Sequence, residues 1–390
     1  MLFGWEFGGG LGHVVRLREI ARHLGESRSC EFLFALQDPK KGVAAGLPRR
    51  SVVAVPAAKV SAAGTRAKPR ETYGEYVSEN LMIEDGAFAA RLAGWDEIIH
   101  KFDPHLVIAD YAPGLSLFAR GRWPVLATGN GYTMPPPEIA AFPALAKLNR
   151  PLYATEPEIV DRLNKDLTRI GARPIERLPQ LNEADAYGLV TLPFFDPYRA
   201  QRQQAYLGAE IPGGGPHPLS TASGGIAYFH EDTQLHDNVL DGLGGASIDM
   251  AAYFGKPLRR VAKKFEGTHV ALVNGPFSLR EDMPGRIVAI HRGSLGFAAA
   301  ALLAGVPQVM AYGHEEHWFM ANAIVKAGAG AAAPYKEVTA SALAEAIDRV
   351  AGSSVMRERA QRLAAENAWF RDATPTRAVA DIAAKLLRTA

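Results

Sequence analysis

The stretch that decides the fold reads His291-Arg292-Gly293-Ser294-Leu295-Gly296-Phe297 and continues through small apolar residues to Ala304-Gly305-Val306-Pro307. A candidate strand over residues 286–290 precedes this stretch. The run of alanine and leucine within the stretch favours a helix. The glycines therefore mark a turn from a strand into a helix. Free backbone N–H groups and a helix N-terminus converge at such a turn, where they can hold a diphosphate without a metal.

Further motifs lie on both sides of this stretch. Glu316-His317 with Ala321-Asn322 and then Ala327-Gly328-Ala329-Gly330 follow it, and Gly8-Gly9-Gly10-Leu11-Gly12-His13-Val14 forms a glycine turn near the N-terminus. Together they resemble the inverting GT-B glycosyltransferases, both the UDP-glycosyltransferase family and the N-acetylglucosaminyltransferase of peptidoglycan synthesis. The C-terminal motifs are similar to the donor half of those enzymes, and the N-terminal turn is similar to their acceptor half. The resemblance covers most of the chain, but only at motif level between about residues 135 and 285.

The resemblance implies an α/β protein of GT-B architecture, with two Rossmann-like doubly wound domains that face one another across a cleft. Short apolar segments that alternate with helical patterns independently predict doubly wound parallel sheets. The candidate strands are residues 1–5, 31–36, 51–55, 106–109, 125–128 and 187–192, then 226–229, 270–273, 287–290 and 308–312.

Turn-forming residues crowd together between residues 196 and 225 and predict a boundary between domains. We expect an acceptor-binding domain over residues 1–205, a linker over 206–222 and a donor-binding domain over 223–373. The tail has apolar residues at helical spacing. In GT-B enzymes such a tail crosses back, so residues 374–390 are expected to pack on the first domain.

Composition limits the class of protein. A length of 390 residues suits two domains, and 43 basic against 41 acidic side chains give no field that would favour nucleic acid as a partner. The single cysteine excludes an internal disulfide and a cysteine-based zinc site. The first residues lack the pattern of a secretion signal, and no apolar run is long enough for a transmembrane segment. We expect a cytoplasmic protein, for which peripheral membrane contact stays open.

Two residues carry the chemistry that the resemblance implies. His13 follows the first glycine turn and precedes the expected first helix, where the matching histidine of the family removes the proton of the acceptor hydroxyl. An imidazole suits that task near neutral pH. Asp110, directly after the candidate strand 106–109, matches the aspartate that orients this histidine. We expect His13 and Asp110 to be the catalytic residues.

The donor loop is expected to hold the diphosphate of a nucleotide sugar. His291 matches the family histidine that contacts the diphosphate, Gly293 and Gly296 allow the backbone to come close, and Arg292 is a candidate for a further phosphate contact. The expected donor-binding residues are Gly12, Thr233, His291, Arg292, Gly293, Ser294, Leu295, Gly296, Glu316 and His317.

The chain also departs from the family pattern. The glutamate that usually holds the ribose falls at Ala299 or Ala300, and the usual acidic–Gln pair that reads the sugar hydroxyls is Glu316-His317. The first turn of the donor domain differs as well, and Thr233 is the residue that can supply a phosphate contact there. No tryptophan stands where the plant enzymes stack one on the uracil. The ribose and the base must therefore be held in other ways.

The motifs favour a metal-independent, inverting glycosyltransferase without a cofactor. It would move a sugar from a UDP- or dTDP-sugar to a hydroxyl of a small-molecule or lipidic acceptor, since no Asp-x-Asp pair is present to bind a metal-bound diphosphate. One alternative is a non-catalytic donor-binding or activator homologue, and another is a UDP-sugar epimerase on the same fold. A nicotinamide dehydrogenase fits poorly, because the third glycine of its motif would fall on His13.

Overall fold

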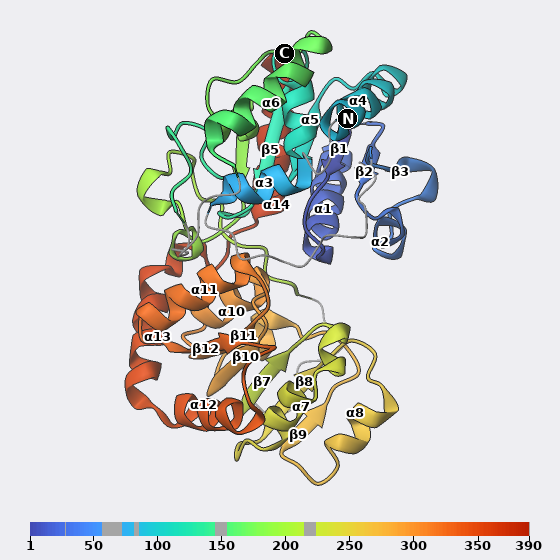
Figure 1. The fold of residues 1–390 in the computed structure, drawn as a ribbon. Coiled ribbons are helices and arrows are strands. Elements are labelled where there is room, and N and C mark those ends of the chain that lie inside the picture. The colour runs from blue at the N-terminus through green and yellow to red at the C-terminus, as the bar shows by residue number, and fades with distance from the viewer. Residues whose placement is uncertain (28, 57–71, 82–85, 145–153, 214–223, 390) are drawn as a thin grey trace. The chain divides into compact units, whose positions relative to one another are not determined.

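The computed structural model describes residues 1–390 except residues 28, 57–71, 82–85, 145–153, 214–223 and 390 (Figure 1). The chain divides into two compact units. The first unit comprises residues 1–207 together with 374–390, and the second comprises residues 208–373. The expected linker over residues 206–222 therefore lies partly outside the described residues.

The first unit is built on a six-stranded parallel sheet of order β3-β2-β1-β4-β5-β6. Its strands are β1 (Leu2–Trp5), β2 (Leu33–Leu36), β3 (Val52–Ala54), β4 (Val107–Asp110), β5 (Val125–Gly129) and β6 (Ala186–Leu189). The strand order reverses between β1 and β4, which are paired directly. The carboxyl ends of strands at such a reversal are where doubly wound sheets bind ligands.

Helices cover this sheet. They are α1 (Leu11–Ser27), α2 (Pro39–Ala44), α3 (Tyr73–Leu81), α4 (Ala87–Phe102), α5 (Pro113–Ala119), α6 (Glu156–Arg169) and α14 (Pro375–Thr389), with short 3-10 helices at Arg49–Ser51, Leu178–Asn182, Pro193–Phe195 and Arg199–Gln201. The C-terminal helix α14 packs against α1 and β6 (Figure 1). A Cβ atom on Gly188 of β6 would lie 2.7 Å from Cγ2 of Val379, so the close approach of α14 depends on that glycine.

The second unit repeats this plan with a parallel sheet of order β12-β11-β10-β7-β8-β9. Its strands are β7 (Gly225–Tyr228), β8 (Met250–Tyr253), β9 (Val270–Leu272), β10 (Val288–His291), β11 (Gln308–Tyr312) and β12 (Gly330–Pro334). Its helices are α7 (Asp237–Gly244), α8 (Arg259–Lys264), α9 (Leu279–Asp282), α10 (Leu295–Leu303), α11 (Glu315–Lys326), α12 (Ala340–Gly352) and α13 (Ser354–Glu366), with 3-10 helices at Glu231–Leu235 and Ala368–Phe370. The order reverses between β7 and β10, as it does between β1 and β4.

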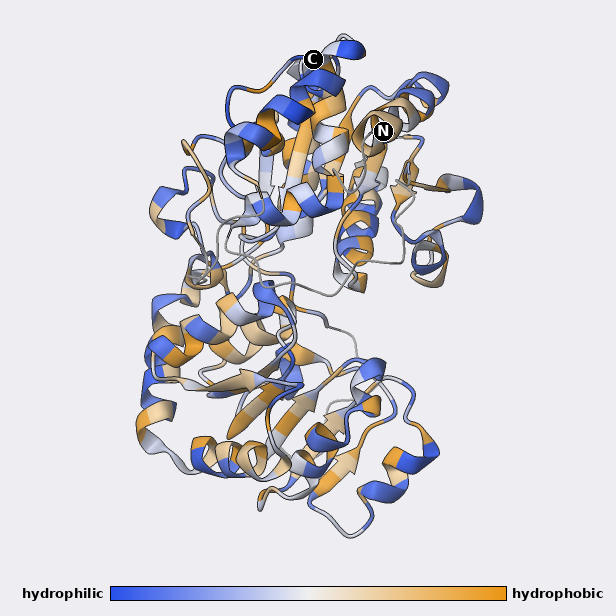
Figure 2. Ribbon diagram, viewed as in Figure 1, coloured by the Kyte–Doolittle hydropathy of each residue, from blue (hydrophilic) through white to orange (hydrophobic). Residues whose placement is uncertain are grey.

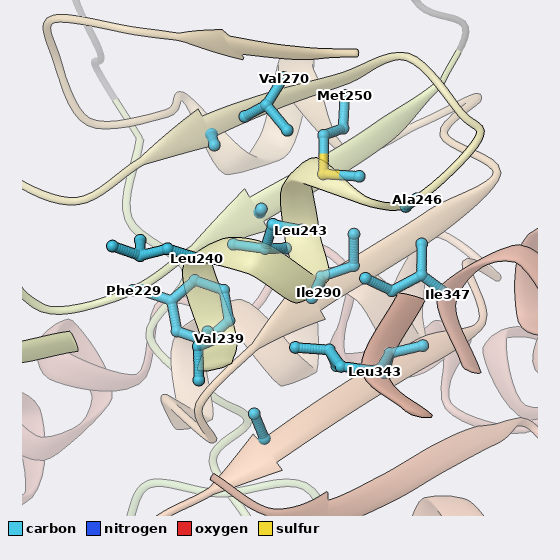
Figure 3. Packing of buried hydrophobic residues seen from close by; sticks show 14 of the residues in the cluster. Phe229, Val239, Leu240, Leu243, Ala246, Met250, Val270, Ile290, Leu343 and Ile347 are labelled. Atoms are coloured by element: carbon cyan, nitrogen blue, oxygen red, sulfur yellow. The ribbon is translucent and has the colours of Figure 1, made fainter. Parts of the chain in front are cut away.

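The core of the second unit forms between this sheet and helices α7 and α12. Figure 3 shows Leu240 and Leu243 of α7 and Ile347 of α12 gathered with Ile290 of β10, all fully buried. Each such side chain contributes roughly 1.5–3 kcal/mol through removal of apolar surface from water. Figure 2 shows the same division of character in both units, with largely hydrophobic strands and helices that alternate hydrophobic and hydrophilic residues. The motif loops follow the carboxyl ends of these buried strands.

The α/β class and the two Rossmann-like doubly wound domains are confirmed. All the candidate strands are present with ends shifted by at most a few residues. Strands β8 and β12 were not predicted. Both are rich in alanine, which has a low strand propensity. No helix in the described part of the chain is both long and apolar enough to cross a lipid bilayer.

Candidate functional site

His13 and Asp110 meet at the reversal point of the first sheet. Helix α1 begins at Leu11, so His13 lies in its first turn. The sequence had suggested a position just before the helix. Asp110 is the last residue of β4 and is fully buried. Because β4 is the direct neighbour of β1, its end lies beside the glycine turn that precedes α1. Nδ1 of His13 is 2.9 Å from Oδ1 of Asp110.

The contact with Asp110 determines which nitrogen of His13 remains available. An ionised carboxylate only accepts hydrogen bonds, so Nδ1 carries the proton and Nε2 keeps a lone pair. Nε2 faces Gly8, whose Cβ, if present, would lie 3.0 Å from it. The φ of Gly8 is +84°, a conformation that favours glycine. The glycine turn thus leaves room at the nitrogen that can accept a proton.

Two aromatic rings pack against the imidazole of His13. The ring of Trp5 stacks on it at a centroid distance of 5.4 Å, and that of Tyr111 stacks at 5.8 Å. Tyr76 in turn stacks on Tyr111 at 5.8 Å. These four residues form a row of stacked rings that comes from β1, α1, the end of β4 and α3.

Two charged residues near this pair were missed in the sequence. Arg16 donates from Nη1 to both carboxylate oxygens of Asp110, at 3.0 and 2.9 Å. Its position three residues after His13 on one helix was the available signal. Glu6 is 2% exposed and accepts hydrogen bonds from the Trp95 indole and the Gly114 backbone N–H, each at 2.7 Å. It ties the end of β1 to α4 and α5.

The other residue expected in this unit is Gly12, which lies exposed in the first turn of α1. A Cβ atom there would meet nothing within 4 Å. Packing within the unit therefore does not require a glycine at this position.

In the second unit, the imidazole of His291 braces its own loop. His291 is fully buried, its Nδ1 accepts from the Gly293 N–H at 3.1 Å, and its Nε2 donates to Oε1 of Gln308 at 2.8 Å. Gln308 donates onward to the Ala298 carbonyl at 3.2 Å. Burial lowers the pKa of His291 to about 4, so the ring is neutral near pH 7. Both ring nitrogens are engaged within the unit. The expected contact of His291 with a diphosphate stays a prediction.

The glycines of the donor loop are also required by packing. Gly293 has a φ of +118°, and its Cβ would lie 2.6 Å from Cγ of His317. The Cβ of Gly296 would lie 2.7 Å from the Glu210 carbonyl oxygen. Ser294 is the N-cap residue of α10, and its side chain makes no capping hydrogen bond. The first N–H groups of an α-helix have no partner within the helix, and those of α10, beginning at Leu295, are candidates to bind an anion.

Arg292 is held by two neighbours, and its side chain is 15% exposed. Its Nη1 donates to both carboxylate oxygens of Asp232, at 2.7 and 2.6 Å, and its guanidinium lies 4.5 Å from the centre of the Tyr335 ring. Thr233, beside Asp232, is fully buried, and its hydroxyl has no hydrogen-bond partner among the described residues. The expected phosphate contact of Thr233 would therefore need a rearrangement of this turn.

Glu316 and His317 lie in the first turn of α11, beside the donor loop. The His317 ring packs on that of His314, with centroids 3.6 Å apart. Its buried Nδ1 makes no hydrogen bond within the part of the chain that the structure describes. Burial, followed by the neighbouring His314 and Arg292, lowers the pKa of His317 well below its usual value. The structure thus brings the loop 291–296 together with His317 and Asp232 at the reversal between β7 and β10.

Comparison with known proteins agrees with this geometry. Residues 279–385 match the family model of the erythromycin biosynthesis protein CIII-like C-terminal domain. No curated protein sequence matches the chain.

Solved glycosyltransferase structures superpose over the whole length. The calicheamicin glycosyltransferase CalG4 gives a TM-score of 0.67 at 17% identity, covering 100% of this chain and 98% of its own. SnogD from Streptomyces nogalater gives 0.64 at 17% identity with 98% of each chain covered. VinC, solved in complex with dTDP, gives 0.62 at 14% identity with 100% of each chain covered. The chain therefore has the GT-B fold of these glycosyltransferases and carries an EryCIII-like C-terminal domain over residues 279–385.

Proposed function

We propose that this chain is an inverting, metal-independent glycosyltransferase. It moves a sugar from a nucleoside-diphosphate sugar, with UDP or dTDP as the nucleotide, to a hydroxyl of a small-molecule or lipidic acceptor. The observation that carries the proposal is the buried His13–Asp110 pair at the reversal of the first sheet. Nε2 of His13 keeps a lone pair when Nδ1 carries the proton, and it is the atom that a general base needs. The dTDP bound to VinC and the antibiotic-related names of the similar proteins support this donor and acceptor class.

In the proposed reaction His13 takes the proton of the acceptor. As the O–H bond of the acceptor breaks, its proton passes to Nε2 of His13 and its oxygen bonds to the anomeric carbon. The bond from that carbon to the diphosphate oxygen breaks on the opposite face, and the nucleoside diphosphate leaves with the electron pair. Asp110, through Nδ1, stabilises the imidazolium that forms. The sugar configuration inverts because a single displacement occurs.

The second unit supplies the stabilisation of the leaving group. The N-terminus of α10 follows the loop that His291 braces, and its N–H groups can bind the diphosphate as negative charge builds on it. His291 acts here by fixing the loop. Glu316 lies in the first turn of α11. In our proposal its carboxylate accepts hydrogen bonds from the sugar.

The row of stacked rings beside His13 fixes the imidazole within the unit. Trp5 and Tyr111 are buried, at 0% and 5% exposure, and pack on the imidazole, so these rings do not identify the acceptor. In our proposal the acceptor presents its hydroxyl to Nε2 of His13. The cytoplasmic location expected from the sequence stays a prediction.

The alternative of a donor-binding protein without catalysis is favoured by one observation. Ala299 and Ala300, where the resemblance would place the ribose-binding glutamate, are buried at 0% and 4% exposure. The ribose must then be held elsewhere or less firmly.

The deciding experiment combines calorimetry with an acceptor screen. UDP and dTDP are titrated into the wild type and into His291→Ala, and the release of nucleotide from UDP- and dTDP-sugars is followed with a panel of hydroxylated acceptors. Our proposal expects binding of one nucleotide, weakened by His291→Ala, and release that depends on an acceptor. Binding without turnover on any acceptor would favour the non-catalytic alternative. Conversion of the sugar without an acceptor would favour an epimerase.

A further inference from the structure

Arg16 shares the carboxylate of Asp110 with His13. The two residues are presented by one face of α1, and Nη1 of Arg16 lies 3.0 and 2.9 Å from the two oxygens of Asp110. Asp110 is fully buried and Arg16 is 8% exposed. A guanidinium and an imidazole therefore bind the same carboxylate at the reversal point of the sheet.

Stability alone does not account well for this arrangement. Removing both charges of a buried ion pair from water costs about as much as the pair regains by attraction. In addition, the buried Nε of Arg16 makes no hydrogen bond with the residues that the structure describes. A buried donor left without a partner lowers stability. Buried polar atoms that lack a hydrogen-bond partner are concentrated at functional sites.

The groups that face His13 come from each element packed around it. From β1 and from the end of β4 come the rings of Trp5 and Tyr111, and burial raises the pKa of Tyr111 well above its usual value, so that it is uncharged. From β4 comes Asp110, and from α1 comes Arg16. The carboxylate of Glu6 is bound by Trp95, Gly114 and Arg91, and Lys41 of α2 donates to the carbonyl of Gly9.

We propose that Arg16 is a positioning residue in a chain His13–Asp110–Arg16. It keeps the Asp110 carboxylate ionised and directed at Nδ1 of His13. By offsetting the charge of that carboxylate, it also keeps the imidazole neutral, and hence able to take a proton, in more acidic solution than a histidine–aspartate pair alone would allow. The catalytic meaning of this inference rests on the proposed function, but the effect of the charge does not.

The direction of the effect follows from electrostatics. Without the cation, the full charge of Asp110 acts on the imidazole and favours its protonated form. His13 should then titrate at a higher pH, by at least about one unit, since an opposite charge within about 4–6 Å shifts a titration by about 1–3 units. Arg16→Gln removes the charge and keeps an amide donor. Arg16→Lys keeps the charge. Arg22→Gln is the matched control, because Arg22 lies on the same helix, is exposed and pairs with Glu19 and Glu26.

The test is a titration of the His13 ring by nitrogen NMR in the full chain, with the signal assigned by comparison with His13→Gln. We expect the midpoint to rise by at least about one pH unit in Arg16→Gln and to stay within about 0.3 unit in Arg16→Lys and Arg22→Gln. An unchanged midpoint in folded Arg16→Gln, or an equal rise in Arg16→Lys, would overturn the inference. Thermal unfolding reports whether each variant is folded.

A second comparison does not need Arg16→Gln to fold. In an Asp110→Asn background the guanidinium has lost the anion that holds it beside His13, so adding Arg16→Gln should raise the His13 midpoint by less than about one unit. A shift of one unit or more between these two would mean that Arg16 does not act through Asp110.

Activity separates the two proposals. If a donor and acceptor are found, the acid limb of the kcat/KM profile should move upward in Arg16→Gln with the NMR midpoint. An NMR shift in a chain that turns over no nucleotide sugar would defeat the proposed function and leave the role of Arg16 intact. Turnover of a nucleotide sugar with no shift of the NMR midpoint would support the proposed function and defeat the role of Arg16.

Discussion

Nδ1 of His13 lies 2.9 Å from Oδ1 of Asp110, although 97 residues separate them in the sequence. The parallel pairing of β1 with β4 brings them together, because the loops that follow two neighbouring strands leave the same edge of the sheet. A buried carboxylate that binds Nδ1 leaves Nε2 as the basic atom. This geometry underlies the predictions for catalysis.

Asp110→Asn should reduce turnover, by a smaller factor than loss of the base itself. The amide cannot stabilise an imidazolium as a carboxylate does, and its NH2 group would face Arg16 or Nδ1 of His13, both of which are donors. The measurement is kcat at saturating donor, with the exposed Asp96→Asn as the control. Wild-type turnover in Asp110→Asn would show that the carboxylate does not orient the base.

Gly293→Ala should weaken nucleotide binding and destabilise the second unit by about 1–3 kcal/mol. The residue has a φ of +118°, and the added Cβ would lie 2.6 Å from Cγ of His317. Gly352→Ala is the matched control, because nothing lies within 4 Å of its Cβ position. Calorimetry with UDP and dTDP, together with denaturant unfolding, measures both effects. Equal behaviour of the two variants would mean that the loop is not held as the structure shows.

Stability should fall as the pH drops from about 6.5 toward 4. Burial lowers the pKa of His291 to about 4, so between these values the unfolded chain binds a proton that the folded chain does not. The difference from an ordinary histidine, about 2.5 units, corresponds to an effect of the order of 3 kcal/mol. His291→Gln should make the dependence on pH shallower, whereas exposed His100→Gln should leave it unchanged. Urea unfolding at a series of pH values checks this, and an equally steep dependence in His291→Gln would contradict it.

Chelation should leave turnover intact. In the proposed reaction the leaving diphosphate is stabilised by the N-terminus of α10 and not by a metal ion. Assays with and without EDTA measure this. Complete loss of activity with EDTA, restored by manganese, would refute metal independence.

Much of the fold was accessible from the sequence because short apolar strands alternate with amphipathic helices. Strands β8 and β12 escaped because their alanine-rich sequences resemble helix. The His13–Asp110 pairing came from the resemblance to a family, since spacing alone does not reveal contacts over 97 residues. The same limit hid Arg16 and Gln308, whose roles depend on the tertiary contacts with Asp110 and His291. A motif also does not show that both ring nitrogens of a histidine are buried and hydrogen-bonded, as they are in His291.

The most direct test of the account is the pair of measurements on His13→Ala. If His13 removes the acceptor proton, the variant should bind UDP or dTDP with the affinity of the wild type while kcat falls by roughly 10²- to 10⁴-fold, the usual range for loss of a general base. Thermal unfolding of the variant confirms that the first unit is intact. Full turnover by His13→Ala with a true acceptor would contradict the central claim.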